Sequence, residues 1–554
     1  MPPRFNIPSK FNIAEWFLDR PAAEHPDRVA ILGEPSAATY GELRALANRA
    51  GNALQGIGCA PGDRVLLVLR DSAEFIAAFF GAAKIGAIAV PVNSFARAAD
   101  FSFYLADSGA SIALVDASAL GEFRPAVEID EEAPKLIVVG GHREIDDEIS
   151  RSSSDAVGGA IDWAEWIASG SEELDSHPSF SHDPAFLLYT SGSGGRPKAA
   201  VHQHKDMLAA TRGYAEGVLG TRADDRMFSV SKLFFAYGLG NGMYFPLSAG
   251  ASTVLNPEKT RVDRVAELLV KHRPTIFFGV PTFYAALLQE ANRGLAVDFT
   301  SVRLAVSAGE PLPAEVFHQC RERFGLEILD GIGSTEMLHI FISNRPGRAR
   351  AASCGTPVPG YEVRITGDDG RTAGIAEIGN LAVRGESALA EYWRKPELSA
   401  GVKPGEWVAT GDKFLRDADG YYHYAGRSDD MIKVSGMWVS PVEVENALLG
   451  DERVAEAAVI GVEDRAGLIK PVAYVILAAG FEPGAGVVAA IREAMRAKLV
   501  HYKCPREIYF VDDLPKTVTG KIQRYLLRDR ARAAGGDDSG KGVSGSGESS
   551  RRDT

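Results

Sequence analysis

The chain has little cysteine: Cys59, Cys320, Cys354 and Cys504 lie far apart in 554 residues. They form no C-x-x-C pair and no cluster with histidine, so they indicate neither a zinc site nor a disulfide framework. The sequence also lacks an uninterrupted apolar run of about 18 residues, and residues 1–12 lack the apolar core of a signal peptide. We therefore expect a protein of the reducing cytoplasm with no membrane partner.

Positive charge is not in excess either, since the formal net charge is −13. This balance argues against a general nucleic-acid surface. The 45% hydrophobic and 24% charged content is that of an ordinary globular protein. By length alone the chain should hold about three or four domain-sized units.

A Walker loop is absent, but residues 189–200 (YTSGSGGRPKAA) have the composition of another phosphate-binding loop. They follow an apolar run, 185–188, that is typical of a buried strand. Small residues allow backbone N–H groups to face an anion, while hydroxyls and cations add donors and charge. Pro197 and Ala199 exclude the Walker pattern. The alternative is a mobile Gly/Ser loop on the surface.

Residues 10–345 alternate strand-like and helix-like segments. Short apolar runs predict strands at 64–69, 87–90, 111–115, 135–139, 252–255, 275–278, 304–307 and 326–329. Helices are expected at 40–56, after an N-cap-like Thr39, and at 72–85. Strand, helix and strand within about 30 residues form a parallel crossover unit. An α/β fold with two successive parallel sheets fits this pattern.

The pattern of apolar and polar residues changes after Pro346. Short alternating runs at 361–365, 380–384 and 421–425 indicate a small antiparallel or barrel-like unit. A compact α+β segment follows Arg427, with basic, amphipathic helices expected near 443–450 and 485–499. Two further stretches of the chain are polar. Residues 142–182 are interpreted as a connection, and 535–554 as a disordered tail.

Five further motifs stand at the ends of expected strands or in the last segment. They are SAGEP at 307–311, DGIGSTE at 330–336, GEW with TGD at 405–412, GRSDDMIKVSG at 426–436, and LPKTVTGKIQR at 514–524. Each alone is also typical of a turn. Because ligands of parallel sheets bind at the carboxyl ends of strands, their order and spacing together indicate one site.

Taken with the loop, these motifs resemble the adenylate-forming superfamily of acyl- and aryl-CoA synthetases, adenylation domains and luciferases, over about residues 10–530. Within it, SKLFFAYGLGN at 231–241 and GIGSTEMLHIFISN at 331–344 look most like benzoate–CoA ligases. The resemblance implies an AMP-forming ligase that joins an aryl acid to the α-phosphate of ATP, releasing pyrophosphate. It then transfers the acyl group to coenzyme A and releases AMP.

The resemblance also implies partners and domains. ATP, Mg²⁺ and coenzyme A would act with a small aromatic acid, in a monomer or homodimer. An AMP-binding domain would cover 10–426, with its barrel-like part at about 347–426. A mobile C-terminal domain would cover 427–532, followed by a disordered tail at 533–554.

Site residues follow from the same resemblance. The β- and γ-phosphates would contact Thr190, Ser191, Gly192, Ser193 and Lys198. Catalysis is assigned to Thr335 at the α-phosphate, Glu336 as the Mg²⁺ ligand, and Lys521 at the transition state. Adenine would contact Ala308, Gly309, Glu310, Pro311, Asp330, Gly331 and Ile332. The ribose would contact Asp412 and Arg427. Asp429 would be the hinge, and Lys433 and Gly436 would reach the pantetheine tunnel after rotation.

The acyl pocket is expected to be short and flat, as a benzoate-sized acid requires. Its walls would be Phe235, Ala236, Tyr237, Ala308, Gly331, Gly333, Leu338, His339 and Ile340. Lys232 would either attract the carboxylate or lie on a helix surface. His339 would either contact a ring substituent such as a para-hydroxyl or be a satisfied wall residue.

Three alternatives stay open. The acid is benzoate, a hydroxybenzoate or an aminobenzoate; the enzyme is a CoA ligase or a stand-alone adenylation enzyme that loads a carrier protein; or the fold is a non-catalytic nucleotide-binding scaffold. The loop itself departs from the family pattern, with Gly194 in place of the usual Thr and Ala199 in place of the usual Gly. We expect the missing hydroxyl to weaken ATP binding.

Overall fold

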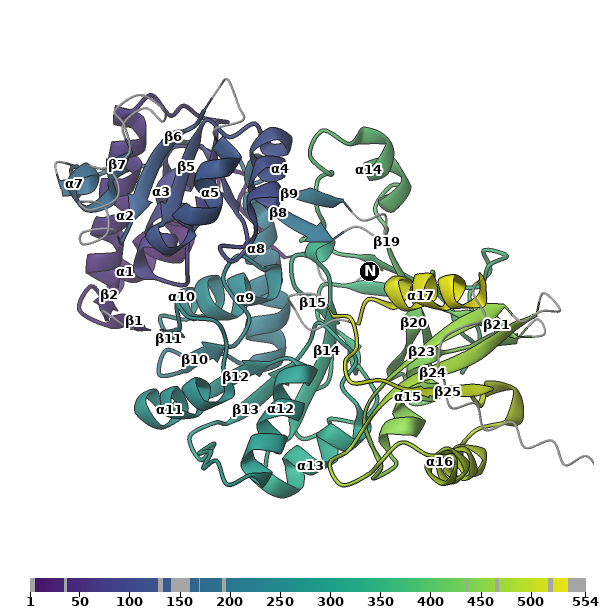
Figure 1. Cartoon of the computed structure of the whole chain (residues 1–554). Coiled ribbons are helices and arrows are strands. Elements are labelled where there is room, and N and C mark those ends of the chain that lie inside the picture. Colours follow the sequence, from purple (N-terminus) through teal and green to yellow (C-terminus); the bar gives the residue numbers. More distant parts are fainter. Residues whose placement is uncertain are drawn as a thin grey trace, which may run out of the picture.

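The computed structural model (Figure 1) describes residues 5–33, 37–127, 133–140, 160–168, 170–191, 196–434, 437–463, 468–516 and 522–536. These residues form two large sheets flanked by helices, a smaller antiparallel sheet, and a C-terminal α+β unit with its own core. The predicted fold class is confirmed.

The first large sheet has seven strands in the order β7-β6-β5-β3-β4-β8-β9. Their bounds are β3 Arg64–Val68, β4 Ile88–Pro91, β5 Ile112–Asp116, β6 Lys135–Val139, β7 Ile161–Asp162, β8 Pro184–Ser191 and β9 Pro197–Gln203. All pair in parallel except β8 with β9, which form an antiparallel hairpin. The sheet therefore carries the predicted phosphate loop at one edge.

Helices α2 Tyr40–Gly56, α3 Ala73–Lys84, α4 Ala98–Ser108 and α5 Leu120–Val127 flank this sheet (Figure 1). The expected N-cap is confirmed, because the Thr39 side chain accepts from the Glu42 N–H and the Glu42 carboxylate accepts from the Thr39 N–H. This reciprocal arrangement satisfies two N–H groups that a helix start leaves unpaired.

The second large sheet has nine strands in the order β16-β15-β14-β13-β12-β10-β11-β1-β2. Their bounds are β1 Val29–Gly33, β2 Ala38–Thr39, β10 Arg226–Ser229, β11 Ser252–Leu255, β12 Ile276–Gly279, β13 Leu304–Ser307, β14 Ile328–Gly333, β15 Ile340–Ser343 and β16 Thr356–Pro357. Strand β1 precedes the whole first sheet in sequence but pairs in parallel with β11. The two sheets are therefore interleaved along the chain, and the expectation of two successive sheets is wrong.

Further helical segments surround the second sheet and connect the two. They are η1 Glu15–Asp19, α1 Arg20–Glu24, α8 His204–Ala210, η3 Thr211–Leu219, α9 Ala236–Leu239, η4 Gly240–Tyr244, α10 Phe245–Ser248, α11 Val262–His272, α12 Pro281–Asn292 and α13 Ala314–Phe324, whereas η2 Ala117–Ala119 follows β5 of the first sheet and leads into α5. One apolar core joins residues of both sheets, including Leu114 and Phe186 of the first and Ile276 and Leu329 of the second. The large sheets are thus packed into one continuous body.

The smaller sheet consists of β17 Glu362–Thr366, β18 Gly379–Arg384, β19 Val408–Arg416 and β20 Tyr422–Arg427, with helix α14 Pro396–Val402 inserted before β19. Its strands pair antiparallel, as expected. Strands β17 and β20 stand at opposite edges, so the described residues form an open sheet.

The C-terminal unit contains the hairpin β21 Ile432–Val434 and β22 Met437–Val439, and the sheet of β23 Val454–Glu463, β24 Ile469–Leu477 and β25 Glu507–Phe510. Its helical segments are α15 Pro441–Leu449, α16 Ala485–Lys498, η6 His501–Lys503 and α17 Arg524–Gly536. Helix α16 is basic, as expected, but α15 contains no basic residue, so that part of the expectation is wrong.

Two polar stretches differ from their interpretation. Residues 142–159 of the expected connection lie outside the described residues, whereas residues 161–168 form strand β7 and helix α7 Trp163–Ala168. Helix α17 extends to Gly536, so the first residues of the expected tail are helical. In the described parts of the chain no helix is long and apolar enough to cross a membrane.

Candidate active site

The phosphate loop is presented by the β8–β9 hairpin. Thr190 pairs with Lys198 and Ser191 with Pro197, so the loop residues are the tip of a two-stranded ribbon. Residues 192–195, with the predicted ligands Gly192 and Ser193, lie outside the described residues, as does the Ser191 side chain. The hairpin itself explains why Thr190 and Lys198 lie together, although they are eight positions apart in sequence.

Lys198 on β9 meets Glu336, which lies on the short turn between β14 and β15 of the other large sheet. Lys198 Nζ lies 3.7 Å from Glu336 Oε1. It also lies 4.2 Å from the centroid of the Tyr392 ring, and the Tyr392 hydroxyl donates to Glu336 Oε1 at 2.6 Å. Burial lowers the pKa of Lys198, while the Glu336 carboxylate acts in the opposite direction and Arg427 adds to the lowering. A cation, a carboxylate and a phenol thus form one polar cluster beside the loop.

The cluster suits Mg²⁺ bound mainly by phosphate. Among the described residues there is no group of three or more His, Cys, Asp or Glu side chains that would enclose a metal. Mg²⁺ is usually held by one or two carboxylates together with water and substrate phosphates. A single half-buried carboxylate, Glu336, next to a phosphate loop fits that pattern of ligands.

Asp412 and Arg427 are brought together by the smaller sheet. They are directly opposite on β19 and β20, and Arg427 Nη1 lies 3.1 Å from Asp412 Oδ1. The same guanidinium nitrogen donates to the Thr410 carbonyl at 3.2 Å. This ion pair fixes the carboxylate that the resemblance assigns to the ribose.

The two segments expected around adenine are neighbours on the nine-stranded sheet. Ser307 on β13 pairs with Asp330 on β14, so residues 308–311, which follow β13, start beside residues 330–332 of β14. Gly309 has a φ of 96°, a conformation that favours glycine. Burial raises the pKa of Asp330 well above its ordinary value. The sheet thus joins two motifs that lie about twenty positions apart in sequence.

His339 is a buried residue of the predicted acyl pocket. Its ring lies between those of Tyr214, Tyr237 and Phe245, at centroid distances of 5.2, 5.5 and 4.6 Å. Nε2 is 3.1 Å from Asn241 Oδ1. Burial lowers the pKa of His339 to about 3, so the imidazole is neutral. Nε2 is thus paired within the wall while Nδ1 has no hydrogen-bond partner among the described residues, so both interpretations of His339 stay open.

The other pocket residues lie on the segments that frame His339. Ala236 begins helix α9 with Phe235 as its N-cap residue, and the Tyr237 hydroxyl donates to the Gly279 carbonyl at 3.2 Å. Leu338 and Ile340 flank His339 and are buried, as is Ala308. A Cβ at Gly333 would lie 2.6 Å from the His339 carbonyl oxygen, so only glycine fits that close approach.

Lys232 departs from one of its two interpretations. It lies between β10 and α9, outside any helix, and is buried. Its ammonium donates to the Asn256 carbonyl at 2.5 Å and lies 3.5 Å from Asp71. The helix-surface interpretation is therefore wrong, and the positive charge is already paired.

The predicted hinge lies between two anchored residues. Arg427 is bound to Asp412 on one side, and on the other Asp430 lies 2.7 Å from Arg528 and 3.5 Å from Arg524. Asp429 is exposed in the turn between them. Lys433 lies on β21 with its ammonium 5.3 Å from the Trp438 ring centroid. Gly436 and Lys521 lie outside the described residues.

Two contacts around the polar cluster of Lys198 and Glu336 were not predicted from sequence. Tyr392 bonds to Glu336 from a polar segment without a motif, so no sequence signal marked it. His202 bonds to the Thr335 carbonyl from the end of β9. This contact had a signal in the sequence. Residues 198 and 202 are four positions apart on one strand, so His202 lies on the same face as Lys198.

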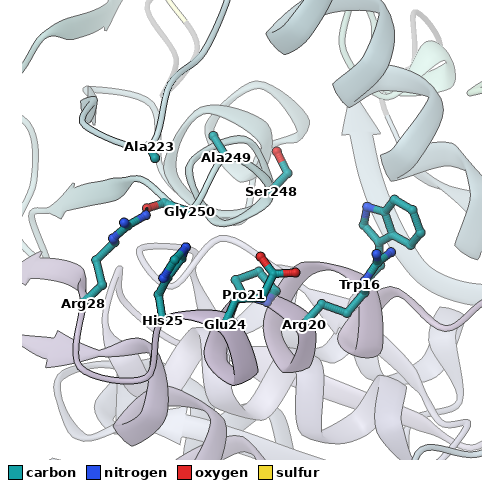
Figure 2. Close-up of a pocket in the computed structure, with 10 residues that line it drawn as sticks. All are labelled: Trp16, Arg20, Pro21, Glu24, His25, Arg28, Ala223, Ser248, Ala249 and Gly250. Carbon is teal, nitrogen blue, oxygen red and sulfur yellow. Dashed lines mark hydrogen bonds between the residues drawn. The ribbon is translucent and has the colours of Figure 1, made fainter.

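A separate pocket of about 240 Å³ lies between helix α1 and residues 248–250 (Figure 2). Its lining includes Arg20, whose guanidinium is 4.1 Å from the Trp16 ring centroid, and Arg28, which donates to the Gly250 carbonyl at 3.1 Å. None of the predicted site residues lines it.

Comparison with known proteins identifies the family. Residues 18–393 match the family described as AMP-binding enzyme, and residues 443–521 match the AMP-binding enzyme C-terminal domain. The chain is 43% identical over 532 residues to benzoate–CoA ligase of Thauera aromatica, covering 95% of this chain and 97% of that protein. It is 40% identical over 528 residues to 4-hydroxybenzoate–CoA/benzoate–CoA ligase of Rhodopseudomonas palustris, covering 94% of each.

Among solved structures, the anthranilate CoA ligase AuaEII in complex with anthranoyl-AMP superposes with a TM-score of 0.88 at 39% identity. The match covers 96% of this chain and 99% of that one. These matches extend over both the large sheets and the C-terminal unit. The chain therefore belongs to the adenylate-forming superfamily of AMP-binding enzymes.

Proposed function

We propose that this protein is an ATP-dependent aryl-acid–CoA ligase and that its acid is benzoate. The observation that carries the proposal is the cluster of Lys198, Glu336 and Tyr392 beside the phosphate loop, in a chain 43% identical to a benzoate–CoA ligase. The reaction joins a carboxylate oxygen to the α-phosphorus of ATP, expels pyrophosphate, and then exchanges AMP for the sulfur of coenzyme A.

In the first step the chain must hold three anionic groups together. Lys198 and the loop from Thr190 to Ser193 would hold the β- and γ-phosphates, and Thr335 would contact the α-phosphate. Mg²⁺, with Glu336 as its ligand, would neutralise phosphate charge. Lys521 would stabilise the charge that develops at the α-phosphate, because preorganised cations act most strongly where charge appears in the transition state.

The nucleoside would be held by the sheet edges described above. Adenine would lie against residues 308–311 and 330–332. Asp412, kept in place by Arg427, would accept hydrogen bonds from the ribose hydroxyls. The adenine-binding segments and Asp412 would orient the nucleoside, and this orientation would fix the α-phosphate relative to the acid.

The acid would lie against Tyr237 and His339. A neutral imidazole ringed by aromatic side chains favours a flat, uncharged ring over a fatty chain. A hydroxybenzoate and an aminobenzoate remain the alternatives, because the relatives include proteins named 3-hydroxybenzoate–CoA ligase and anthranilate–CoA ligase.

Thioester formation would follow rotation of residues 427–532 against residues 10–426 about Asp429. This rotation would withdraw Lys521 and bring Lys433 and Gly436 to the site. A groove of about 500 Å³ has Val434 among its lining residues. Its basic lining residues are Lys470, Arg492, Arg496, His501 and Arg506. Cations of this density suit the phosphates of coenzyme A. ATP and coenzyme A are intracellular co-substrates, which supports a cytoplasmic location. The protein would act there as a monomer or homodimer.

The decisive experiment supplies a panel of acids with ATP, Mg²⁺ and free coenzyme A. The panel contains benzoate, hydroxy-, amino- and halobenzoates, cyclohexane carboxylates and phenylacetate. We expect benzoate to give the highest kcat/KM for AMP release. A parallel assay with a phosphopantetheinylated carrier protein tests the second candidate, a stand-alone adenylation enzyme. Transfer to the carrier alone would replace the CoA-ligase proposal.

A further inference from the structure

Thr335 and Glu336 stand on a single helical turn that has few hydrogen bonds of its own. This turn is the 3₁₀ segment η5, Thr335–Met337, and such short segments have weak internal hydrogen bonds. Its carbonyl groups are also held by other parts of the chain. The Leu389 N–H donates to the Glu336 carbonyl at 2.7 Å, and the Ser387 hydroxyl donates to the Met337 carbonyl at 2.8 Å.

The Thr335 carbonyl accepts from the Leu338 N–H at 3.0 Å and also faces His202. Nε2 of His202 lies 2.8 Å from this oxygen. A carbonyl oxygen only accepts, so Nε2 must carry a proton. His202 and Lys198 both belong to β9, four positions apart on one face of the strand. One strand therefore contacts the same turn twice, at the Glu336 carboxylate and at the Thr335 backbone.

The second ring nitrogen of His202 also faces an acceptor. Nδ1 lies 2.9 Å from Asp206 Oδ2, and neither side chain is exposed to solvent. Asp206 already accepts from the Gln203 N–H at 3.0 Å and lies 3.1 Å from Lys205 Nζ, as a carboxylate does. Both ring nitrogens of His202 therefore face oxygen atoms, Nε2 the Thr335 carbonyl and Nδ1 the Asp206 carboxylate. The Phe186 ring stacks on the imidazole at 5.1 Å.

We propose that His202 is a positioning residue for adenylation. Its buried ring is held at Nδ1 by Asp206, and Nε2 donates the hydrogen bond that fixes the Thr335 carbonyl. This bond sets the direction of the Thr335 and Glu336 side chains toward the α-phosphate and Mg²⁺. The inference rests on the proposed function, because that function assigns those two side chains their roles.

Two substitutions separate the two hydrogen bonds of the ring. In His202→Gln the amide nitrogen reaches the place of Nε2, so the donor to Thr335 remains. In His202→Asn the amide reaches only the place of Nδ1, so the bond to Asp206 remains and the donor to Thr335 is lost. His204→Asn is the matched control, because His204 is also buried but its Nδ1 accepts from the Ile13 N–H, away from the turn.

The measurement is acid-dependent ATP–pyrophosphate exchange, with thioester formation from synthetic benzoyl-AMP as the second readout. We expect His202→Asn to lower kcat of exchange about 100-fold, the scale of a displaced reacting group, and to change thioester formation less than about threefold. His202→Gln should retain exchange within about tenfold of the unmodified protein, and His204→Asn should match it.

Equal loss in both half-reactions, unchanged exchange in His202→Asn, or a His202→Gln variant as slow as His202→Asn would overturn the inference. If His202→Asn does not fold, His202→Gln decides alone: exchange within about tenfold supports the role, and a loss of about 100-fold overturns it. Absence of exchange in the unmodified protein would instead remove the proposed function.

Discussion

The Tyr392 hydroxyl donates a 2.6 Å hydrogen bond to Oε1 of Glu336. The same tyrosine ring lies 4.2 Å from Lys198 Nζ, which is itself 3.7 Å from that carboxylate oxygen. Burial and the neighbouring Glu336 carboxylate raise the pKa of Tyr392, so the phenol keeps its proton and remains a donor. One side chain thus orients both the proposed magnesium ligand and the proposed phosphate-binding lysine.

Tyr392→Phe removes this donor and keeps the ring under Lys198. We expect the apparent KM for MgATP to rise about fivefold, as the loss of one hydrogen bond of roughly 1 kcal/mol implies. The measurement is pyrophosphate exchange over a Mg²⁺ titration. Tyr421→Phe, which removes a hydroxyl bound to the Arg348 carbonyl, is the control. An unchanged KM in Tyr392→Phe would show that Glu336 does not depend on this bond.

Lys521→Ala should separate the two half-reactions. We expect acyl-AMP formation to fall by roughly 100-fold or more, the scale of one lost electrostatic donor, while thioester formation from synthetic acyl-AMP falls far less. Lys503→Ala is the matched control, because Lys503 is paired with Glu443 at 2.7 Å and should not act in catalysis. Equal loss in both half-reactions would contradict the role of Lys521.

Asp429→Pro should arrest the C-terminal domain. The two neighbouring anchors, Arg427 to Asp412 and Asp430 to Arg528, leave the turn around Asp429 to absorb a rotation. Proline fixes φ there, so pyrophosphate release should persist while thioester formation fails. Asp429→Ala leaves the backbone free and should support both steps. Full activity of the proline variant would remove the hinge role.

Gly194→Thr restores the hydroxyl that the loop lacks. Measured by exchange at varied ATP, the apparent KM should fall about fivefold if one hydrogen bond of roughly 1 kcal/mol is regained. Gly194 lies outside the described residues, so this prediction rests on the sequence. A KM that stays the same or rises would mean that the backbone donors of the loop suffice.

The lowered pKa of the buried His204 should reduce the free energy of unfolding of the protein in acid. Burial lowers its pKa to about 4 in the folded protein, against about 6.5 when unfolded. Below pH 6.5 the unfolded chain takes up a proton that the folded chain refuses until about pH 4, so stability falls as pH falls through this window. The loss is roughly 3 kcal/mol for this pKa difference.

His204→Asn should flatten the pH dependence, because asparagine still accepts from the Ile13 N–H but does not titrate. The free energy of unfolding is measured from urea midpoints at about pH 7 and about pH 4.5, where the unmodified protein should lose more stability than the variant. Equal losses in both proteins would show that His204 is not the group responsible.

Local features of the sequence predicted much of this molecule. Helix 40–56 and its Thr39 cap, and the strand 304–307, follow from short-range patterns and match the structure. The pairing of β1 with β11 was missed, because two segments more than 200 positions apart have no local signal for each other. Tyr392 was missed for the same reason: its role comes from the place where the chain returns, and its own neighbours in sequence do not reveal it.

The central claim, that this chain activates benzoate and transfers it to coenzyme A, is tested most directly by incubating the full-length protein with ATP, Mg²⁺, benzoate and coenzyme A. We expect benzoyl-CoA, AMP and pyrophosphate in equal amounts, with pyrophosphate exchange that depends on the acid. The claim would be contradicted if no aryl acid of the panel supported pyrophosphate exchange. It would also be contradicted if the acyl group were transferred to a carrier protein but never to coenzyme A.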